Sequence, residues 1–424
     1  MSIRRLPRCF KCSGFLRSSF QSMWARKKID IPAIQIIKGI GRCLSPIADT
    51  NSLWQIEALW PNTLPVLSVR SGFDLLMGSV DWPPGSEVLM SGLTIPDMPT
   101  IVKEHQFQVV PVDLQPSSLY PSAATIKSKI TTNTRAIVVA HLFGQRQDLS
   151  EIAMLAHSKG IMLIEDCAQA YCGNQHQGSE CADVSMFSFG PIKTNTALGG
   201  GLIKVRDANL LGRLKDRQQT LPKQTNAKYA KRLLKYLWIK GLCTRMGTRA
   251  FYQGCRLLGK DHDLVASQLA RSFPAGELIN RIRYRPSGAL LAEMNDRLHR
   301  YNCCAMDTRI RRAMSLRNRI DAPCSVVGFK DSAHWVFAIR CPNRNGLVRH
   351  LWNKGFDATT RCSLKPISQE LKHTNQLHGE IVFLPFEDSM PDKELLRMAN
   401  CLNGYFAWQS NETSETFPQS NSVS

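Results

Sequence analysis

Four side chains between residues 166 and 193 have the types and the spacing to hold a reactive cofactor. Asp166 and Gln169 stand three residues apart after one apolar run, and Ser188 and Lys193 stand five apart at the end of the next. A carboxylate can keep a ring nitrogen protonated, a hydroxyl can bind a phosphate, and a lysine amine can form an imine (a Schiff base) with an aldehyde. Pyridoxal 5′-phosphate (PLP) carries all three groups. The sequence therefore predicts a PLP site, and the alternative is a buried strand followed by an ordinary surface lysine.

The surrounding elements indicate an α/β domain. Short apolar runs alternate with helical stretches, which is typical of parallel strands buried on both faces of a sheet. These runs lie at 87–91, 108–112, 135–140 and 184–189. Another apolar run precedes Ser71 and Gly72, and a helical stretch is expected to begin at Asp74. Free backbone N–H groups at a helix start attract anions, so Ser71 and Gly72 are a second candidate for binding the phosphate.

The motif around the lysine resembles that of a known family. Residues 165–169 read E-D-C-A-Q, residues 187–189 read F-S-F, and Lys193 and a run of glycines at 199–201 follow. This pattern resembles the DegT/DnrJ/StrS-type sugar aminotransferases, which are fold type I PLP enzymes. The resemblance runs from about residue 66 to residue 405, with a gap at 217–260.

The resemblance implies a fold and a set of site residues. The expected fold is the α/β large domain of a fold type I PLP-transferase, with a mainly parallel sheet, plus a smaller C-terminal α+β domain. A homodimer with a shared active site and a cytoplasmic location are also implied. Lys193 and Asp166 are the expected catalytic residues. The residues expected to bind the cofactor are Ser71, Gly72, Ile95, Asp166, Gln169, Ser188, Lys193 and Arg283.

Three positions depart from the family pattern. Phe73 stands where the family usually has a threonine that binds the phosphate, so one side-chain hydroxyl is missing. Ile95 follows Thr94 where the family usually has an aromatic residue, and loses a contact worth about 0.5–1.5 kcal/mol. Arg283 stands where the family has an asparagine that reaches across the dimer to the phosphate. A guanidinium could bind that phosphate more strongly, or could be a solvated charge.

The positive charge of the chain is concentrated in two segments. Residues 1–29 hold eight Lys or Arg and no acid, and residues 217–260 hold eleven and no acid, while the whole chain has a formal charge of +20. A general nucleic-acid surface is therefore not indicated. Residues 1–29 fit either a mitochondrial-type targeting segment or a flexible basic tail, and we expect the tail. The Cys9–Cys12 pair has no second pair at zinc-site spacing, so no metal is expected.

Residues 217–260 contain a basic amphipathic helical pattern that the family does not usually carry. Its apolar stripe, which includes Tyr229, Leu233 and Trp238, could lie on an anionic membrane surface or could pack on protein. No apolar stretch is long enough to span a bilayer.

The predicted organisation has five parts. It comprises a basic, poorly ordered segment at 1–45, a PLP-binding domain at 46–216, a basic amphipathic helical insertion at 217–280, a linking helix and small domain at 281–408, and a disordered tail at 409–424.

The function expected from these features is PLP-dependent transfer of an amino group from an amino acid to a keto-sugar. The resemblance implies glutamate as the donor and a nucleotide-linked sugar as the acceptor. The product would serve amino-sugar or polysaccharide biosynthesis. One alternative is a PLP-dependent sugar dehydratase, but such members of the family have histidine in place of Lys193. The other alternative is a PLP-fold protein that binds its ligand without turnover, which Phe73 and Ile95 keep open.

Overall fold

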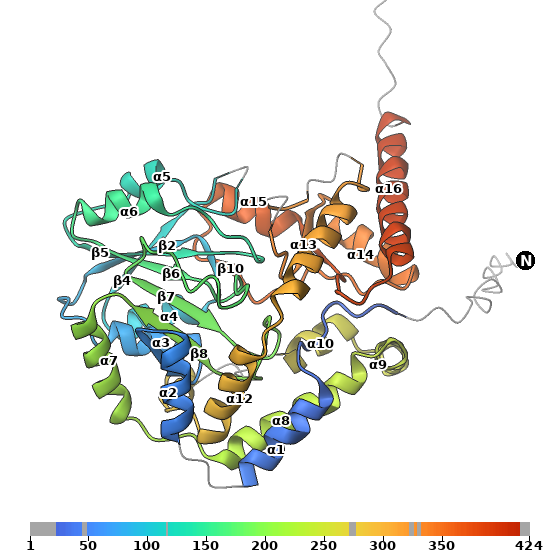
Figure 1. Ribbon diagram of the computed structural model, residues 1–424. Coiled ribbons are helices and arrows are strands. Elements are labelled where there is room, and N and C mark those ends of the chain that lie inside the picture. Colours follow the sequence, from blue (N-terminus) through green and yellow to red (C-terminus); the bar gives the residue numbers. More distant parts are fainter. Residues whose placement is uncertain are drawn as a thin grey trace, which may run out of the picture.

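The structure of the chain is a computed structural model that describes residues 23–44, 49–115, 118–270, 277–321, 326–328 and 332–415. Its large domain is built on a seven-stranded sheet with the order β1-β8-β7-β6-β5-β2-β4 (Figure 1). These strands are β1 (Thr63–Val66), β2 (Glu87–Ser91), β4 (Gln108–Val112), β5 (Thr134–Ala140), β6 (Met162–Asp166), β7 (Val184–Ser188) and β8 (Gly201–Val205). Strands β4, β2, β5, β6 and β7 run parallel to one another, whereas β8 is antiparallel to both β7 and β1. The sheet is therefore mainly parallel, as the sequence predicts.

The strand register brings the predicted site residues to one edge of the sheet. Asp166 ends β6 and pairs with Ala140, the last residue of β5, while Ser188 ends β7. Neighbouring parallel strands end on the same side of a sheet, and ligands bind in the crevice outside their carboxyl ends. This topology places Asp166 and Ser188 at the same edge, with Ser188 two residues beyond Met186, the register partner of Asp166.

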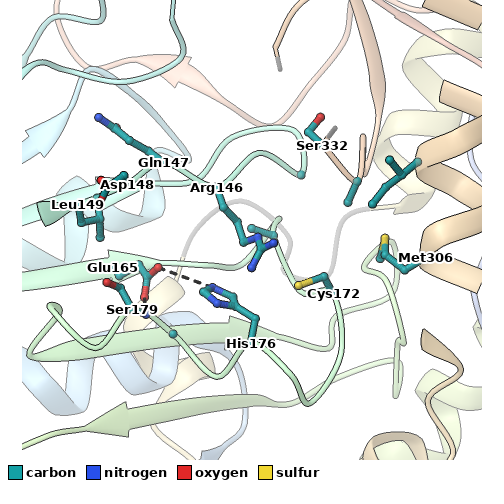
Figure 2. Close-up of a pocket in the computed structure, with 15 residues that line it drawn as sticks. Arg146, Gln147, Asp148, Leu149, Glu165, Cys172, His176, Ser179, Met306 and Ser332 are labelled. Carbon is teal, nitrogen blue, oxygen red and sulfur yellow. Dashed lines mark hydrogen bonds and ion pairs between the residues drawn. The ribbon is translucent and has the colours of Figure 1, made fainter. Parts of the chain in front are cut away.

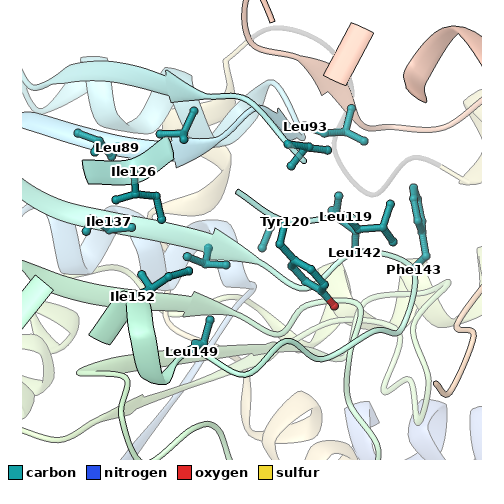
Figure 3. Close-up of a cluster of buried hydrophobic side chains, with 14 of the residues drawn as sticks. Leu89, Leu93, Leu119, Tyr120, Ile126, Ile137, Leu142, Phe143, Leu149 and Ile152 are labelled. Carbon is teal, nitrogen blue, oxygen red and sulfur yellow. The ribbon is translucent and has the colours of Figure 1, made fainter. Parts of the chain in front are cut away.

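Helices cover both faces of the sheet. On one face, α5 (Ala123–Lys127) and α6 (Ser150–His157) pack on a buried cluster that includes Leu89, Ile137 and Ile152 (Figure 3). On the other face, α3 (Val69–Met77), α4 (Asp97–Glu104) and α7 (Ala208–Gln219) enclose a second cluster. Double coverage of this kind is the reason that the strands read as continuous apolar runs.

A smaller C-terminal unit follows two linking helices, α12 (Gly288–His299) and α13 (Cys303–Arg317). Its strands β9 (Phe337–Arg340) and β11 (Ile381–Leu384) pair antiparallel. The helices α14 (Arg344–Asn353), α15 (Lys372–Glu380) and α16 (Asp392–Glu415) complete it. The short strand β10 (Lys365–Pro366) pairs with β3 (Leu93–Thr94), which ties the small unit to the large domain.

Helices also fill the segment expected to be an insertion. They are α8 (Asn226–Leu242), α9 (Arg245–Leu257) and α10 (His262–Ala270), and α8 packs on α1 (Ala33–Leu44) (Figure 1). Tyr229 and Leu233 of α8 are fully buried in a cluster with Ile36 of α1 and Leu290 of α12. This half of the apolar stripe packs inside the protein. No helix in the described part of the chain is both long and apolar enough to cross a membrane.

Two expected disordered segments differ in the structure. The poor order predicted for residues 1–45 is wrong for residues 23–44, where Ile29, Ile31 and Ile36 are buried and α1 forms; residues 1–22 lie outside the described part. The disorder predicted for 409–424 is wrong at 409–415, because α16 continues to Glu415. Each residue that extends a formed helix adds a hydrogen bond, so a polar composition does not prevent elongation. Residues 416–424 also lie outside the described part.

Candidate functional site

Lys193 lies in a tight loop that follows β7. Its backbone N–H donates to Gly190 O at 3.0 Å, and Thr196 Oγ1 donates to the carbonyl of Gly190 at 2.6 Å. On the far side of this loop, the hydroxyl of Tyr229 on α8 donates to Ala197 O at 2.7 Å. The loop is therefore held by its own turn and by a buried helix from the basic segment, which gives the lysine a defined position.

The Lys193 amine and the Asp166 carboxylate interact in a poorly solvated site. Burial lowers the pKa of Lys193 to about 8, while the charge of Asp166 opposes that change. Burial likewise raises the pKa of Asp166, and the Ala168 N–H and Lys193 lower it in part. The Ala168 N–H donates to Asp166 Oδ1 at 2.9 Å. The structure thus brings together the two residues predicted to be catalytic, as an amine of reduced basicity near a half-buried carboxyl.

Gln169 and Ser188 keep hydrogen-bonding capacity for a ligand. Gln169 Oε1 accepts the backbone N–H of Phe143 at 3.0 Å, and this bond fixes the amide beside β5 and β6. Ser188 Oγ accepts a long bond from Gly190 N at 3.4 Å. A hydroxyl can donate as well as accept, so this bond leaves the Ser188 proton able to reach a phosphate.

The phosphate site predicted at Ser71 and Gly72 differs from the structure. Helix α3 begins at Val69 rather than at Asp74, with Ser68 as its N-cap. The N–H of Ser71 donates to Ser68 Oγ at 3.2 Å and that of Gly72 to Ser68 O at 3.0 Å. These amides are therefore already paired, and the expectation that they are free is wrong. The physical reason is a serine three residues upstream that caps the helix.

Phe73 and Arg70, on either side of this pair, lie in different surroundings. Phe73 is fully buried in the core, so the family's threonine position does not face the site. Arg70 pairs with Asp97 and acts electrostatically on both Asp166 and Lys193. Arg70 is thus a cation near the site that sequence reasoning missed, although it directly precedes Ser71. It can supply a positive charge for a phosphate.

The remaining two predicted cofactor residues have other partners. Ile95 follows β3 and packs against the buried clusters on both sheet faces. Arg283 follows α11 (Leu278–Ile282), and its guanidinium forms a two-point pair with Asp74 at 2.9 and 3.0 Å. It also lies 3.5 Å from Glu104. Within one chain, Arg283 is therefore a neutralised charge rather than a free phosphate ligand.

Trp335 of the small unit is a further residue that sequence reasoning missed. The Lys193 Nζ lies 4.4 Å from the centroid of its ring, which is within the range of a cation–π contact. The Trp335 indole N–H donates to Ile192 O at 2.9 Å and so fixes the ring beside the lysine loop. Nothing in the sequence near residue 335 signals this role, because the contact joins residues 143 apart.

A buried ionic network supports Asp166 from the other face of β6. Glu165 accepts from the N–H of Ser179 at 2.8 Å and from the hydroxyl of Ser185 at 2.7 Å, and it pairs with His141 at 2.8 Å. Burial by itself raises the pKa of Glu165, but the hydrogen bond and charge of His141 and the two serine donors outweigh it and lower that pKa to about 2. The network anchors the strand end that carries Asp166.

A cavity of about 360 Å³ lies beside this network, between large-domain loops and α13 (Figure 2). Arg146, His176 and Cys172 line it from the large domain, and Met306 and Ser332 line it from the opposite side. Three buried polar atoms of its lining residues have no hydrogen-bond partner in the described structure. They are Gln147 Oε1, His176 Nε2 and Ser332 Oγ. The cavity includes neither Lys193 nor Asp166, but Glu165 and Ala170 in its wall flank the segment 166–169.

The residues present fit PLP on its ring and aldehyde sides. An under-bonded carboxyl, a weakly basic amine and an amide at 166–193 match the ring nitrogen, the aldehyde and the ring oxygen. On the phosphate side the fit rests on Ser188 and Arg70, since the amides of Ser71 and Gly72 are paired.

The chain shares its fold with a solved structure. The chain is similar to the aminotransferase TlmJ of Streptoalloteichus hindustanus, with a TM-score of 0.65 and 17% identity over 91% of this chain and all of that one. A likeness at this identity concerns the fold, and it confirms the predicted PLP-transferase fold.

The sequence comparisons match part of the chain. Residues 62–248 match the model of the DegT/DnrJ/EryC1/StrS aminotransferase family. Over 132 residues the chain is 34% identical to GDP-perosamine synthase of Escherichia coli O157:H7, which is 30% of this chain and 36% of that protein. It is also 34% identical to the L-glutamine:2-deoxy-scyllo-inosose aminotransferase of Streptoalloteichus tenebrarius over 155 residues, 36% of each. These matches confirm the resemblance, and the matched segment contains Asp166, Gln169, Ser188 and Lys193. The chain spans about a third of the length of the curated relatives that it matches.

Proposed function

We propose that this protein is a PLP-dependent aminotransferase that moves an amino group from an amino acid, with glutamate as the expected donor, to a keto-sugar. The single observation that carries the proposal is that Lys193 and Asp166, at the carboxyl ends of β7 and β6, lie close enough for each charge to shift the pKa of the other. Its position in the segment that matches the aminotransferase family supports the same reading. A nucleotide-linked sugar and a role in amino-sugar or polysaccharide biosynthesis are part of the proposal.

Three side chains of this site have roles in the proposed reaction. PLP, when bound, would supply an electron-withdrawing ring that stabilises negative charge on the carbon that loses a proton. Asp166 would hold the ring nitrogen, and its burial strengthens that hydrogen bond. The Lys193 amine, once the donor has displaced it, would accept and return the proton. Its pKa of about 8 suits this work near neutral pH. Trp335 would shield the amine from water.

Two alternatives make different predictions. A dehydratase of this family is disfavoured by Lys193 itself. A protein that binds PLP or sugar without turnover is favoured by the core position of Phe73 and the paired amides of Ser71 and Gly72. The aminotransferase and the binding protein differ in whether an amino donor converts the bound cofactor.

The test is a pair of half-reactions on the purified protein. A yellow protein that loses its visible absorbance with L-glutamate and regains it with a keto-sugar is an aminotransferase. Lys193→Ala should abolish covalent attachment of PLP, mapped by borohydride reduction and peptide mass spectrometry. Asp166→Asn should keep much of the cofactor affinity but lower turnover by about 10²-fold or more, as expected for a lost electrostatic contact in a catalytic site. A protein that binds PLP but is unchanged by every donor would support the binding alternative.

The cavity in Figure 2 supports a hydroxyl-rich acceptor. Its volume lies within the range of small-molecule pockets, about 300–1,000 Å³. Gln147 Oε1, His176 Nε2 and Ser332 Oγ have no hydrogen-bond partner among the described residues, and such groups can bind sugar hydroxyls. His176 Nε2 also lies 4.0 Å from Glu165 Oε1. Ser332→Ala and Gln147→Leu should therefore raise the KM for the keto-sugar and leave that for the amino donor unchanged. Equal effects on both substrates would contradict this placement.

We propose, as the family resemblance implies, a cytoplasmic homodimer with a shared active site. Arg283 would reach the partner's phosphate only by leaving Asp74, to which it is paired at 2.9 and 3.0 Å. Sedimentation gives the oligomeric state. Mixing inactive Lys193→Ala and Arg283→Ala chains tests sharing, because complementary sites would restore part of the activity.

We also propose a peripheral contact of residues 217–260 with anionic membranes, supported by what α8 leaves exposed. Leu234 and Trp238 are 55% and 60% exposed, and Lys231 and Lys235 lie on the same exposed face. Ile34 and Ile37 of the adjoining α1 are exposed as well. Flotation with anionic and neutral liposomes at low and high salt is the test. Binding that is absent, or unchanged in Lys231→Glu/Lys235→Glu, would refute the contact.

A further inference from the structure

Residues 23–31, which we call the N-terminal strap, are anchored to both units of the protein. Trp24 exchanges backbone hydrogen bonds of 2.9 Å with Gly355 and Asp357 of the small unit. At the other end, Asp30 Oδ2 accepts the N–H of Asn195 in the lysine loop at 2.6 Å. The strap leads directly into α1, at the blue end of the described chain in Figure 1. It therefore passes the lysine loop on its way between the two units.

Most charges of the strap are matched by charges elsewhere. Arg26 pairs with two aspartates, Lys28 pairs with a glutamate at 2.6 Å, and Asp30 lies 3.9 Å from an arginine. Lys27 is the exception, because no carboxylate of the described residues lies within ion-pair distance of its amine. Its Nζ donates to the backbone carbonyl of Trp335 at 2.6 Å. A protonated amine has three donors, so two remain for another partner.

Lys27 and Lys193 share one aromatic ring. Their Nζ atoms lie 5.2 Å and 4.4 Å from the centroid of Trp335. Because both distances are measured to one point, the two amines are at most about 10 Å apart. The indole is fixed by its hydrogen bond to the Ile192 carbonyl at 2.9 Å. The strap thus delivers a second amine to the immediate surroundings of the reactive one.

The environment of Lys27 disfavours its protonated form as long as no anion is bound nearby. Burial, with smaller contributions from the positive charges of Arg309 and Lys193, lowers the pKa of Lys27 to about 7, although the charges of Asp30 and Asp388 oppose that change. Arg309 is itself paired with Asp388 at 2.7 Å. A partly buried ammonium without a counterion gains most from a ligand that brings a negative charge.

We propose that Lys27, which Trp335 positions beside Lys193, is a carboxylate-binding site that holds a carboxylate of the amino-acid donor. An amino acid carries an amine and a carboxylate in one short molecule, so its amine can reach the position of Lys193 Nζ while a carboxylate reaches Lys27. This inference rests on the proposed aminotransferase function. It assigns donor binding to a segment outside the part of the chain that matches the family model, residues 62–248.

The test measures binding of a carboxylate that cannot react. Glutarate, which has no amine, is titrated into the full-length protein by calorimetry, with wild type compared to Lys27→Met and Lys27→Arg. Lys28→Met is the matched control, because it removes a neighbouring charge of the same strap that already has a partner. We expect Lys27→Met to weaken glutarate binding by tenfold or more, Lys27→Arg to restore part of it, and Lys28→Met to leave it near the wild-type value. Thermal unfolding checks that each variant keeps the fold.

Three outcomes would overturn the site. They are wild-type glutarate affinity in Lys27→Met, an equal loss in Lys28→Met, and PLP found on Lys27 after borohydride reduction. Failure of the proposed function has a different signature, since that is a wild-type protein that carries no PLP on Lys193 or does not convert it with any donor. Glutarate binding that depends on Lys27 would remain measurable in that case.

Discussion

The amine of Lys193 should be far more reactive at neutral pH than an ordinary lysine amine. Burial lowers its pKa from 10.5 to about 8, and only the neutral form of an amine is nucleophilic. At pH 7 the neutral fraction would be close to one tenth, compared with roughly 0.03% for an unperturbed lysine, which is a gain of about 300-fold. The structure also predicts two opposite changes in this pKa. The Asp166 charge raises it and the Arg70 charge lowers it, so Asp166→Asn should decrease the pKa and Arg70→Gln should increase it.

Competitive labelling measures these pKa values residue by residue. The apoprotein is treated with trace isotopic acetic anhydride from pH 6 to 11, and peptides are quantified by mass spectrometry, with the exposed Lys38 as the internal reference. Labelling of Lys193 should rise tenfold per pH unit below about 8 and level off above it. Labelling of Lys193 that keeps rising to pH 10 would refute the reasoning. So would a change of the Lys193 pKa in the same direction in Asp166→Asn and Arg70→Gln.

Other predictions concern the elements that hold the site. Glu165→Gln should lower the free energy of unfolding by about 3 kcal/mol at pH 7, because a pKa lowered from 4.5 to about 2 stabilises the fold above pH 4.5 and loses that effect as pH falls to 2. Urea unfolding of the wild type and of Glu165→Gln at pH 7 and at pH 2 checks this. An equal difference between the two proteins at both pH values would contradict it. Gly178→Ala should cost about 2 kcal/mol, since φ is +98° and the new Cβ would lie 2.2 Å from a buried serine hydroxyl. Gly160→Ala is its control, with positive φ but open space, and equal losses in the two would disprove the steric argument. Tyr229→Phe should cost about 1–2 kcal/mol in thermal unfolding by leaving the buried Ala197 carbonyl without its hydroxyl donor, and no loss would mean that α8 is not packed there in solution.

The centre of the candidate site could be predicted from the sequence because its geometry is local. Asp166 ends β6 and Ser188 ends β7, and these strands are neighbours in the chain and in the sheet. Residue spacing along such strands sets which side chains meet at their carboxyl ends. Short apolar runs likewise predicted the parallel sheet, since burial on both faces leaves its mark in composition.

The predicted phosphate site at Ser71 and Gly72 shows where inference from local sequence fails. A Ser-Gly pair before a helical stretch predicted free amides, but the helix begins five residues earlier than expected, at Val69, and Ser68 captures those donors. The sequence marks that a helix starts near this point. Which serine becomes its N-cap depends on where packing places the first turn.

Only the tertiary structure revealed Trp335, Lys27 and the order of residues 23–44. A basic, acid-free composition predicted a loose tail, yet Arg26 and Lys28 find acidic partners far along the chain, and Ile29 and Ile31 are buried. Periodicity and composition report whether a segment can bury a face or needs counter-charges. Periodicity and composition do not show which distant residues cover that face or supply those counter-charges, because these contacts depend on the packing of the whole chain.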